Sequence, residues 1–313
     1  MRAPSSGTAA KAAPQPANAV TTSILLVLVA NLGFTITDAS SKWLVLAGFA
    51  AVQLAFMRYV THFIIVVGQE GLASGFRRNP FACERWGLVA LRGVILAVST
   101  SVNFVALKFL PLTITSTIMF SAPLIVALLS WPILGERVGP VRWFAIFMGF
   151  TGVVIAVRPF GEEIHWAVLL SILAAIMLAV YSILTRVLAG EVKTSTMQFY
   201  TGVTGVALYG PLLLVMGAWS EPGNAFNWAL LFSLGVFAWG GHQMLTIAHK
   251  LAPANLLMPF SYSYIIFMTI ASMLVFDQNP DLFTIAGAVI VVIASLIIWR
   301  TGIAQEAVPE ARK

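Results

Sequence analysis

Charged residues are scarce in this chain. They make up 10% of its 313 residues, whereas a soluble domain carries about 25%, and 59% of the residues are hydrophobic. The apolar residues form long runs of roughly 17 to 25, enough to cross a bilayer as helix. They do not form the alternating segments of about ten residues that are typical of outer-membrane barrels. The composition therefore excludes a soluble protein and predicts an all-α integral membrane protein.

Cysteine and clustered metal ligands are also lacking. The one cysteine, Cys83, lies in a charged loop and has no partner for an internal disulfide, and the four histidines are scattered along the chain. The sequence contains no H-E-x-x-H, G-x-S-x-G or Walker A pattern. We therefore expect no metal, no cofactor and no enzymatic activity, although an intramembrane enzyme stays an unfavoured alternative. The net charge of +6 could suggest nucleic acid, but in a membrane protein the basic residues usually report topology.

The apolar runs predict ten transmembrane helices joined by short connections. Residues 1–20 are rich in Ala, Pro and Ser and read as a disordered N-terminal tail, and residues 303–313 as a C-terminal tail. The N-terminal stretch does not resemble a cleavable signal, because the apolar run after it is too long. The expected spans are 21–43, 50–68, 87–107, 113–134, 142–158, 166–186, 196–217, 228–247, 254–275 and 283–300.

Lysine and arginine are distributed unevenly between the two sides of these spans. If the N-terminus lies inside, the outer segments hold only three basic residues, Lys42, Lys108 and Arg158. The inner segments hold thirteen: Arg2, Lys11, Arg77, Arg78, Arg85, Arg137, Arg142, Arg186, Lys193, Lys250, Arg300, Arg312 and Lys313. Cytoplasmic loops of membrane proteins are enriched in Lys and Arg, so we expect both termini on the cytoplasmic side of a bacterial inner membrane.

The sequence contains an internal repeat. ALKFLPLTI at 106–114 matches AHKLAPANL at 248–256, and GFTGVVIAV at 149–157 matches GAVIVVIAS at 287–295. The offsets imply two halves of five spans each, 21–159 and 160–302. Because five is odd, the second half must enter the membrane from the opposite side. Such inverted repeats recur in secondary transporters, which bind substrate near the midplane between the halves.

At residues 106–159 the chain resembles the end of an EamA module of the drug/metabolite transporter superfamily. The resemblance rests on the helix around Pro123, the LGER turn at 134–137 and the closing G-F-x-G-V, with the F-M-R at 56–58 in the second span. It extends over about 20–300, although the second half has FDQNP at 276–280 where the first has LGERV. The resemblance implies ten helices, a central cavity and alternating access without ATP. Members of the family include exporters of amino acids, aromatic ones among them, and riboflavin importers.

Polar residues in the first span predict part of the cavity. Asn31, Thr35, Asp38 and Lys42 are spaced by four, three and four, which places them on one helical face that avoids lipid. Lys42 is close enough to the outer end to snorkel to the interface. Arg58 of the second span lies at a depth comparable with Asp38. The two could form a structural ion pair, or a pair that opens as the cavity changes state.

Other polar residues lie in spans that the repeat brings into correspondence. We interpret Arg92 as an interface anchor, and we expect Pro123 and Pro259 to break their helices and act as hinges. Small polar residues can also serve only as contacts between helices. The residues predicted to line the cavity together with Asn31, Asp38 and Arg58 are Ser99, Asn103, Gln198, Tyr200, Trp239, His242, Gln243, Tyr262 and Tyr264.

The sequence thus predicts a secondary transporter, monomeric or weakly dimeric, that exports amino acids and related small amphipathic metabolites with broad specificity. Charged groups could hold the ends of a zwitterion, while aromatic groups contact its side chain. The alternative within the same superfamily is import of riboflavin or a similar vitamin. A purely structural membrane protein would not explain ionisable residues inside spans.

Overall fold

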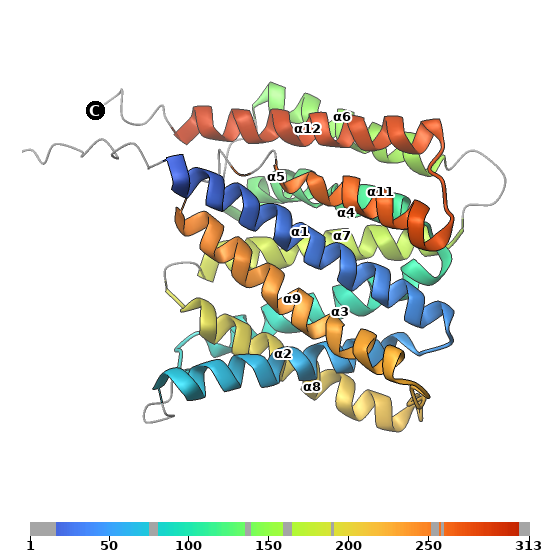
Figure 1. Cartoon of the computed structure of the whole chain (residues 1–313). Coiled ribbons are helices and arrows are strands. Elements are labelled where there is room, and N and C mark those ends of the chain that lie inside the picture. Colours follow the sequence, from blue (N-terminus) through green and yellow to red (C-terminus); the bar gives the residue numbers. More distant parts are fainter. Residues whose placement is uncertain are drawn as a thin grey trace, which may run out of the picture.

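The computed structural model describes residues 17–74, 81–134, 139–158, 165–188, 191–251, 257 and 260–306, and within these ranges every regular element is a helix (Figure 1). The first half contributes α1 (Ala17–Leu46), α2 (Ala51–Ser74), α3 (Trp86–Phe109), α4 (Leu112–Met119), α5 (Ala122–Leu134) and α6 (Pro140–Val157). The second half contributes α7 (Ala167–Leu188), α8 (Thr194–Val215), α9 (Ala225–Leu251), α11 (Ser263–Phe276) and α12 (Leu282–Glu306).

These helices confirm the all-α membrane architecture. Within the described ranges, nine helical stretches are long and apolar enough to cross a membrane, with α4 and the start of α5 counted as one stretch, and α11 is shorter but apolar. A helix satisfies its own backbone hydrogen bonds, which the hydrocarbon layer cannot do. The helix boundaries reach beyond some predicted ones: α1 begins at Ala17, inside the expected tail, and α12 continues to Glu306. The rest of both predicted tails lies outside the described residues.

The fourth span is broken, as expected from its proline. α4 ends at Met119 and α5 begins at Ala122, with Phe120 and Ser121 in a turn between them. Pro123 is the second residue of α5 and has no N–H with which to continue the hydrogen-bond ladder of α4. The prediction of a break at Pro123 is confirmed, and hinge motion there stays a prediction. Pro259, the expected counterpart, lies outside the described residues.

The helix pairs are related by exchange of the two halves. α1 packs on α9 as α7 packs on α3, and α2 packs on α9 as α8 packs on α3. Two helices pack on their own counterparts: α2 on α8, and α6 on α12 (Figure 1). This exchange is the arrangement expected of two repeats.

Both of these self-paired contacts run antiparallel and are closed by glycine. Along α2 and α8, Tyr59 meets Gly205 whereas Phe63, one turn later, meets Gly202. α6 and α12 approach so closely that a Cβ atom at Gly152 would lie 2.8 Å from the carbonyl oxygen of Gly287. Helices in membranes pack through small residues in this way. Antiparallel contact between corresponding helices is what an inverted repeat requires.

The bundle has two ends, which we call the terminal end, where α1 begins and α12 ends, and the far end (Figure 1). At the far end, the Gln53 side chain exchanges two hydrogen bonds with the backbone of Ser220, at 2.7 and 3.0 Å, and Arg158 forms an ion pair with Asp281. An apolar cluster drawn from α1, α2, α3, α9 and α11 fills this half of the bundle; its members include Leu44, Leu54, Phe104, Leu231 and Met268. The helices are therefore held together at the far end by polar ties and by this apolar cluster.

Candidate substrate-binding site

The polar face predicted on α1 points into the bundle and is bonded to other helices. Asn31 is 6% exposed, and its amide nitrogen donates to the carbonyl oxygens of Phe260 and Ser261 at 3.2 and 3.1 Å. The same nitrogen lies 2.9 Å from the hydroxyl of Ser263, the first residue of α11. Asn31 thus ties α1 to the segment that leads into α11.

Asp38 lies two turns further along the same face. Its carboxylate accepts a hydrogen bond from the hydroxyl of Tyr264 on α11. The Tyr264 ring in turn stacks on Phe120, at the break between α4 and α5, with the ring centroids 5.5 Å apart. One acidic side chain on α1 is therefore connected to both α11 and the broken fourth span.

The structure corrects the snorkelling interpretation of Lys42. Its side chain is 1% exposed, and its ammonium nitrogen donates to the carbonyl oxygen of Leu110 at 2.5 Å. The ammonium group also lies 5.3 Å from the centre of the Phe276 ring. Lysine snorkels when the interface is within reach of its head group. Here the connection after α3 and the end of α11 enclose the head group instead.

Arg58 on α2 is the second charged group of the centre. Its guanidinium donates to the hydroxyl of Thr100 on α3 at 2.9 Å and lies 5.7 to 5.9 Å from the rings of Tyr59 and Phe104. The predicted ion pair between Asp38 and Arg58 is not formed within 4 Å. Asp38 accepts a hydrogen bond from the Tyr264 hydroxyl instead, and Arg58 donates one to the Thr100 hydroxyl. Two opposite charges thus lie in the centre and are held by neutral partners.

α9 contributes an aromatic and a polar group to the same region. The His242 ring meets the ring of Phe34 on α1 edge-on, with centroids 5.1 Å apart. The indole nitrogen of Trp239, one turn earlier, is buried without a hydrogen-bond partner. Gln243 is directed differently, because its amide lies 3.5 Å from that of Gln69 near the terminal end of α2.

The serine and asparagine predicted on α3 differ in how they are used. Ser99 is bonded to the carbonyl oxygen of Ala174 on α7 at 2.9 Å, which is a contact between helices. Asn103 lies one turn beyond Ser99, is 7% exposed and keeps its amide oxygen buried without a partner. A buried unsatisfied amide oxygen is costly. Asn103 is therefore the better candidate for contact with a ligand.

Three predicted residues are not brought together with Asp38 and Arg58. Tyr262 is 8% exposed and packs against Ala288 on α12 and the ring of Phe120. Tyr200 packs in the cluster of Cys83, Val89, Leu188, Val192 and Met197. Gln198 is buried, and its backbone carbonyl lies 3.2 Å from the imidazole of His62 on α2.

Arg92 is not an interface anchor, as the sequence suggested, but a buried connection among three helices. Its side chain is 4% exposed and donates to the hydroxyls of Thr185 and Tyr181 on α7, at 2.7 and 2.5 Å. It also donates to the Thr201 hydroxyl on α8 at 3.2 Å. The hydroxyl groups around Arg92 accept hydrogen bonds from its guanidinium. The prediction of an interface anchor followed from the depth of Arg92 in the membrane alone, and it is wrong.

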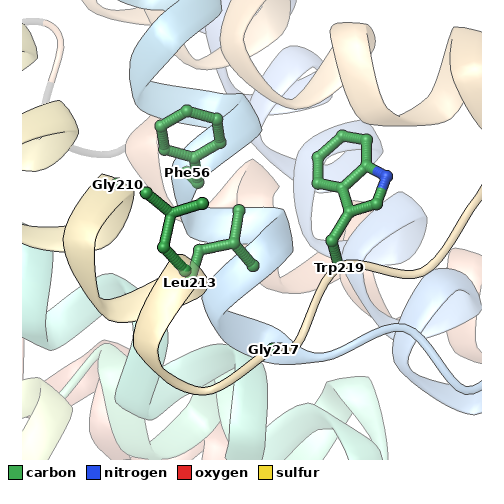
Figure 2. A pocket seen from close by; sticks show the side chains of 6 residues that line it. Phe56, Gly210, Leu213, Gly217 and Trp219 are labelled. Carbon is green, nitrogen blue, oxygen red and sulfur yellow. The ribbon is translucent and has the colours of Figure 1, made fainter.

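A separate apolar pocket of about 390 Å³ lies near the far end and is not part of this site (Figure 2). It is lined by Phe56, Gly210, Leu213, Leu214, Gly217 and Trp219. No charged side chain lines it, so it offers nothing with which to recognise a polar solute.

The residues that sequence reasoning missed are the partners of the charges. Thr100, Tyr59 and Phe104 surround Arg58, and Phe34 and Phe120 carry the aromatic contacts of His242 and Tyr264. The spacing of Thr100, one turn before Asn103, was a usable signal. The sequence gives no comparable signal for the phenylalanines, because apolar residues are expected at every position of a membrane span. Among the described residues, no three His, Cys, Asp or Glu side chains gather in a way that could hold a metal ion.

Membrane-length helices in two inverted halves, with charged groups held at their centre, define a multi-pass membrane protein of the secondary-transporter class. The model of the EamA-like transporter family matches residues 21–158 and matches again at 165–300. The chain therefore belongs to the EamA-like transporter family, as its sequence suggested.

Three similar proteins are all named as transporters, but their substrates differ. The chain is 28% identical to a riboflavin transporter of Rhizobium johnstonii, over 95% of this chain and 97% of the relative. It is 28% identical to an S-adenosylmethionine uptake transporter of Rickettsia prowazekii, over 88% and 90%. It is 27% identical to a pseudopaline exporter of Pseudomonas aeruginosa, over 89% and 96%.

A crystal structure of another protein has the same fold. It matches this chain with a TM-score of 0.60 over 86% of this chain and 96% of that chain, at 19% sequence identity. At this identity the likeness extends to the fold alone.

Proposed function

We propose that this transporter exports amino acids and related small amphipathic metabolites across a bacterial inner membrane by alternating access. The observation that carries the proposal is that Asp38 and Arg58 lie in the centre of the bundle without pairing with each other. Leaving charges in a membrane interior is expensive, and such residues usually serve a pathway or a ligand. A zwitterion offers each of them an oppositely charged partner.

The chemistry of the two groups fits the two ends of an amino acid. Among the described residues Thr100 is the hydrogen-bond partner of Arg58, through one guanidinium nitrogen, and a guanidinium fork can take a carboxylate with two parallel bonds. Asp38 can accept an ammonium group. The rings of Phe34 and His242 provide apolar surface for a side chain without selecting a single shape. Broad specificity with a preference for aromatic amino acids follows.

Uptake of riboflavin or a similar vitamin is the second candidate. It is favoured by the similarity to the riboflavin transporter of Rhizobium johnstonii, which extends over nearly the whole of both chains. The buried Trp239 indole N–H and Asn103 amide oxygen provide one donor and one acceptor without partners. A flavin ring carries both kinds of group at its edge and could stack on aromatic side chains.

Transport by purified protein in liposomes distinguishes the two. Vesicles preloaded with labelled L-phenylalanine, L-leucine, S-adenosylmethionine or riboflavin are compared for efflux with and without protein. We expect efflux of the two amino acids and at least a tenfold loss in Arg58→Gln. Arg85→Gln is the matched control, because Arg85 pairs with Glu191 at the exposed terminal end. Riboflavin movement without amino-acid movement would select the second candidate instead.

We further propose the orientation and assembly that the sequence predicts. Both termini face the cytoplasm, the halves 21–159 and 160–302 form the two repeats, and the transporter works without catalysis or cofactor as a monomer or weak homodimer. The excess of Lys and Arg on one side supports the orientation. A reporter fused after Lys313 should be active in its cytoplasmic form. Activity only in the periplasmic form would reverse the assignment.

A further inference from the structure

Tyr264 is hydrogen-bonded to Asp38, the acidic side chain at the centre of the bundle. Its hydroxyl donates to the Asp38 carboxylate, and in the described part of the chain this is the only side-chain hydrogen bond that Asp38 receives. The other charged groups near Asp38 are engaged elsewhere: Arg58 binds Thr100, and Lys42 binds the carbonyl of Leu110. An ionised carboxylate can accept about four hydrogen bonds. Asp38 is therefore held by one neutral donor that a stronger donor could replace.

A substrate ammonium group is such a donor. An ammonium group brings a full positive charge to the hydrogen bond, which the neutral tyrosine hydroxyl does not, and the attraction between opposite charges is stronger in a protein interior than in water. The Tyr264 hydroxyl and a substrate amine would compete for the same carboxylate oxygens. A ligand without an amine would have nothing to offer Asp38 in exchange for the tyrosine.

We infer that Tyr264 is a specificity-determining residue: its hydroxyl holds the position at Asp38 that the ammonium group of a substrate takes during transport. The inference rests on the proposed function, because it concerns the amino-acid site described above. Tyr264 acts as an internal competitor that lowers the affinity for every amine and leaves the affinity for solutes without an amine unchanged.

The exchange also changes how α1 is attached to the ninth span. α1 has two ties to this segment, Asn31 to Phe260, Ser261 and Ser263, and Asp38 to Tyr264. Binding of an amine removes the second tie and leaves the first. The Tyr264 ring, in the second half, stacks on Phe120 of the first half at the break of the fourth span. Release of the tyrosine therefore affects a contact between the two halves. Substrate recognition is thereby linked to the break of the fourth span, where a hinge is predicted.

The test compares Tyr264, whose hydroxyl bonds to Asp38, with Tyr262, whose hydroxyl does not. Tyr264 and Tyr262 both pack against Phe120, but the Tyr262 hydroxyl lies on the α12 side, near Ser295, and makes no hydrogen bond with Asp38. Tyr264→Phe removes the competing hydroxyl, and Tyr262→Phe removes one that does not contact Asp38. Binding of L-phenylalanine, 2-phenylethylamine and 3-phenylpropanoate to the purified proteins is measured by equilibrium dialysis.

We expect Tyr264→Phe to bind L-phenylalanine and 2-phenylethylamine about tenfold more tightly than the wild type, which corresponds to ~1.4 kcal/mol. Its affinity for 3-phenylpropanoate, which has no amine, should stay within about twofold, and Tyr262→Phe should resemble the wild type for all three. Unchanged or weaker amine binding in Tyr264→Phe would overturn the inference, as would an equal change for all three ligands. Absence of L-phenylalanine binding to the wild type would instead refute the proposed function.

A second variant keeps the test decisive if Tyr264→Phe folds poorly. Asp38→Asn keeps an acceptor for the Tyr264 hydroxyl but removes the negative charge that attracts an amine. It should lose the preference for L-phenylalanine over 3-phenylpropanoate that the wild type shows. Retention of that preference would mean that Asp38 is not the amine site, and Tyr264 would then have nothing to compete for.

Discussion

Lys42 on α1 donates a hydrogen bond to the carbonyl oxygen of Leu110, the residue that caps the C-terminus of α3, and the two atoms lie 2.5 Å apart. The C-terminal end of a helix carries partial negative charge, so its carbonyl is a favourable partner for a cation. No carboxylate takes part in this contact. Lys42 therefore fastens α1 to the end of α3 even though Asp38 is only one turn away.

Replacing Lys42 should destabilise the far end. Lys42→Ala removes a side chain that is 1% exposed and leaves a buried carbonyl without its donor. Each effect costs about 1 to 3 kcal/mol, so the melting temperature of the purified protein should fall by several degrees. Lys108→Ala is the control, because Lys108 is exposed at the same end. Equal melting of the two variants would show that the contact with Leu110 contributes nothing.

Removal of the Thr100 hydroxyl should weaken substrate binding while the fold is kept. Thr100→Val has the same shape but cannot hold the Arg58 guanidinium at 2.9 Å or the Tyr59 hydroxyl at 3.1 Å. A hydrogen bond to a charged group contributes about 1.5 to 3 kcal/mol, so we expect KM for the transported amino acid to rise roughly tenfold. Thr151→Val, on the lipid face of α6, should leave KM unchanged. A fall in kcat at constant KM would argue against a positioning role.

The glycine contact between α6 and α12 should not tolerate a methyl group. In Gly152→Ala the new Cβ atom would lie 2.8 Å from the Gly287 carbonyl oxygen, so the helices must separate. Overpacking of this kind costs about 1 to 3 kcal/mol, which should lower the melting temperature. At Gly68 on α2 nothing lies within 4 Å of such an atom. Gly68→Ala should therefore be neutral or slightly stabilising, and similar losses in both variants would contradict this explanation.

The Arg158–Asp281 pair should make stability at the far end depend on pH. Asp281 lies in the connection before α12, where the backbone N–H of Thr284 and the Arg158 guanidinium hold the pKa of its carboxyl below the usual value. A lowered pKa in the folded state means that the stabilisation is present above about pH 4 and is lost as the pH falls further. Both side chains are more than 40% exposed, so the effect should be under ~1 kcal/mol.

Asp281→Asn keeps the cap of α12 and removes the charge, which isolates this effect. The variant should melt slightly below the wild type at pH 7, and the difference should shrink as the pH falls below about 4. Addition of salt at pH 7 should also reduce the difference, because exposed charges are screened. A difference that persisted unchanged at low pH would assign it to the cap and not to the ion pair.

The sequence predicted the helices and the repeat because both can be recognised from the order of residues along the chain. Long apolar runs and two pairs of matched segments, one of them sharing an A-x-K-x-x-P placement, were enough to identify an all-α fold in two halves. Asn31 and Asp38 were recognised because a polar face on an apolar helix must avoid lipid. Pro123 was recognised because proline has no N–H to continue a helical hydrogen-bond ladder, although Pro211 lies inside α8 without ending it.

The partners of the charged residues could not be predicted in the same way. Lys42 was expected at the interface, but its position near a helix end says nothing about which connection folds over it. The expected pairing of Asp38 with Arg58 followed from similar depth, whereas the hydroxyls of Tyr264 and Thr100 lie within reach only after the helices are packed. Hydroxyl groups are common in membrane spans, so the sequence does not show which of them meets a charge.

The backbone of this transporter is repeated, but its charges are not. Among the described residues, the charged side chains of the central region all come from the first half: Asp38, Lys42, Arg58 and Arg92. If the halves were identical, exchanging their conformations would give inward-open and outward-open states of equal free energy. Unequal charges remove that equality, and a difference of only 1.4 kcal/mol changes the ratio of the two populations tenfold. Under the proposed alternating access, we therefore expect the protein to have a preferred resting state even when no gradient acts on it.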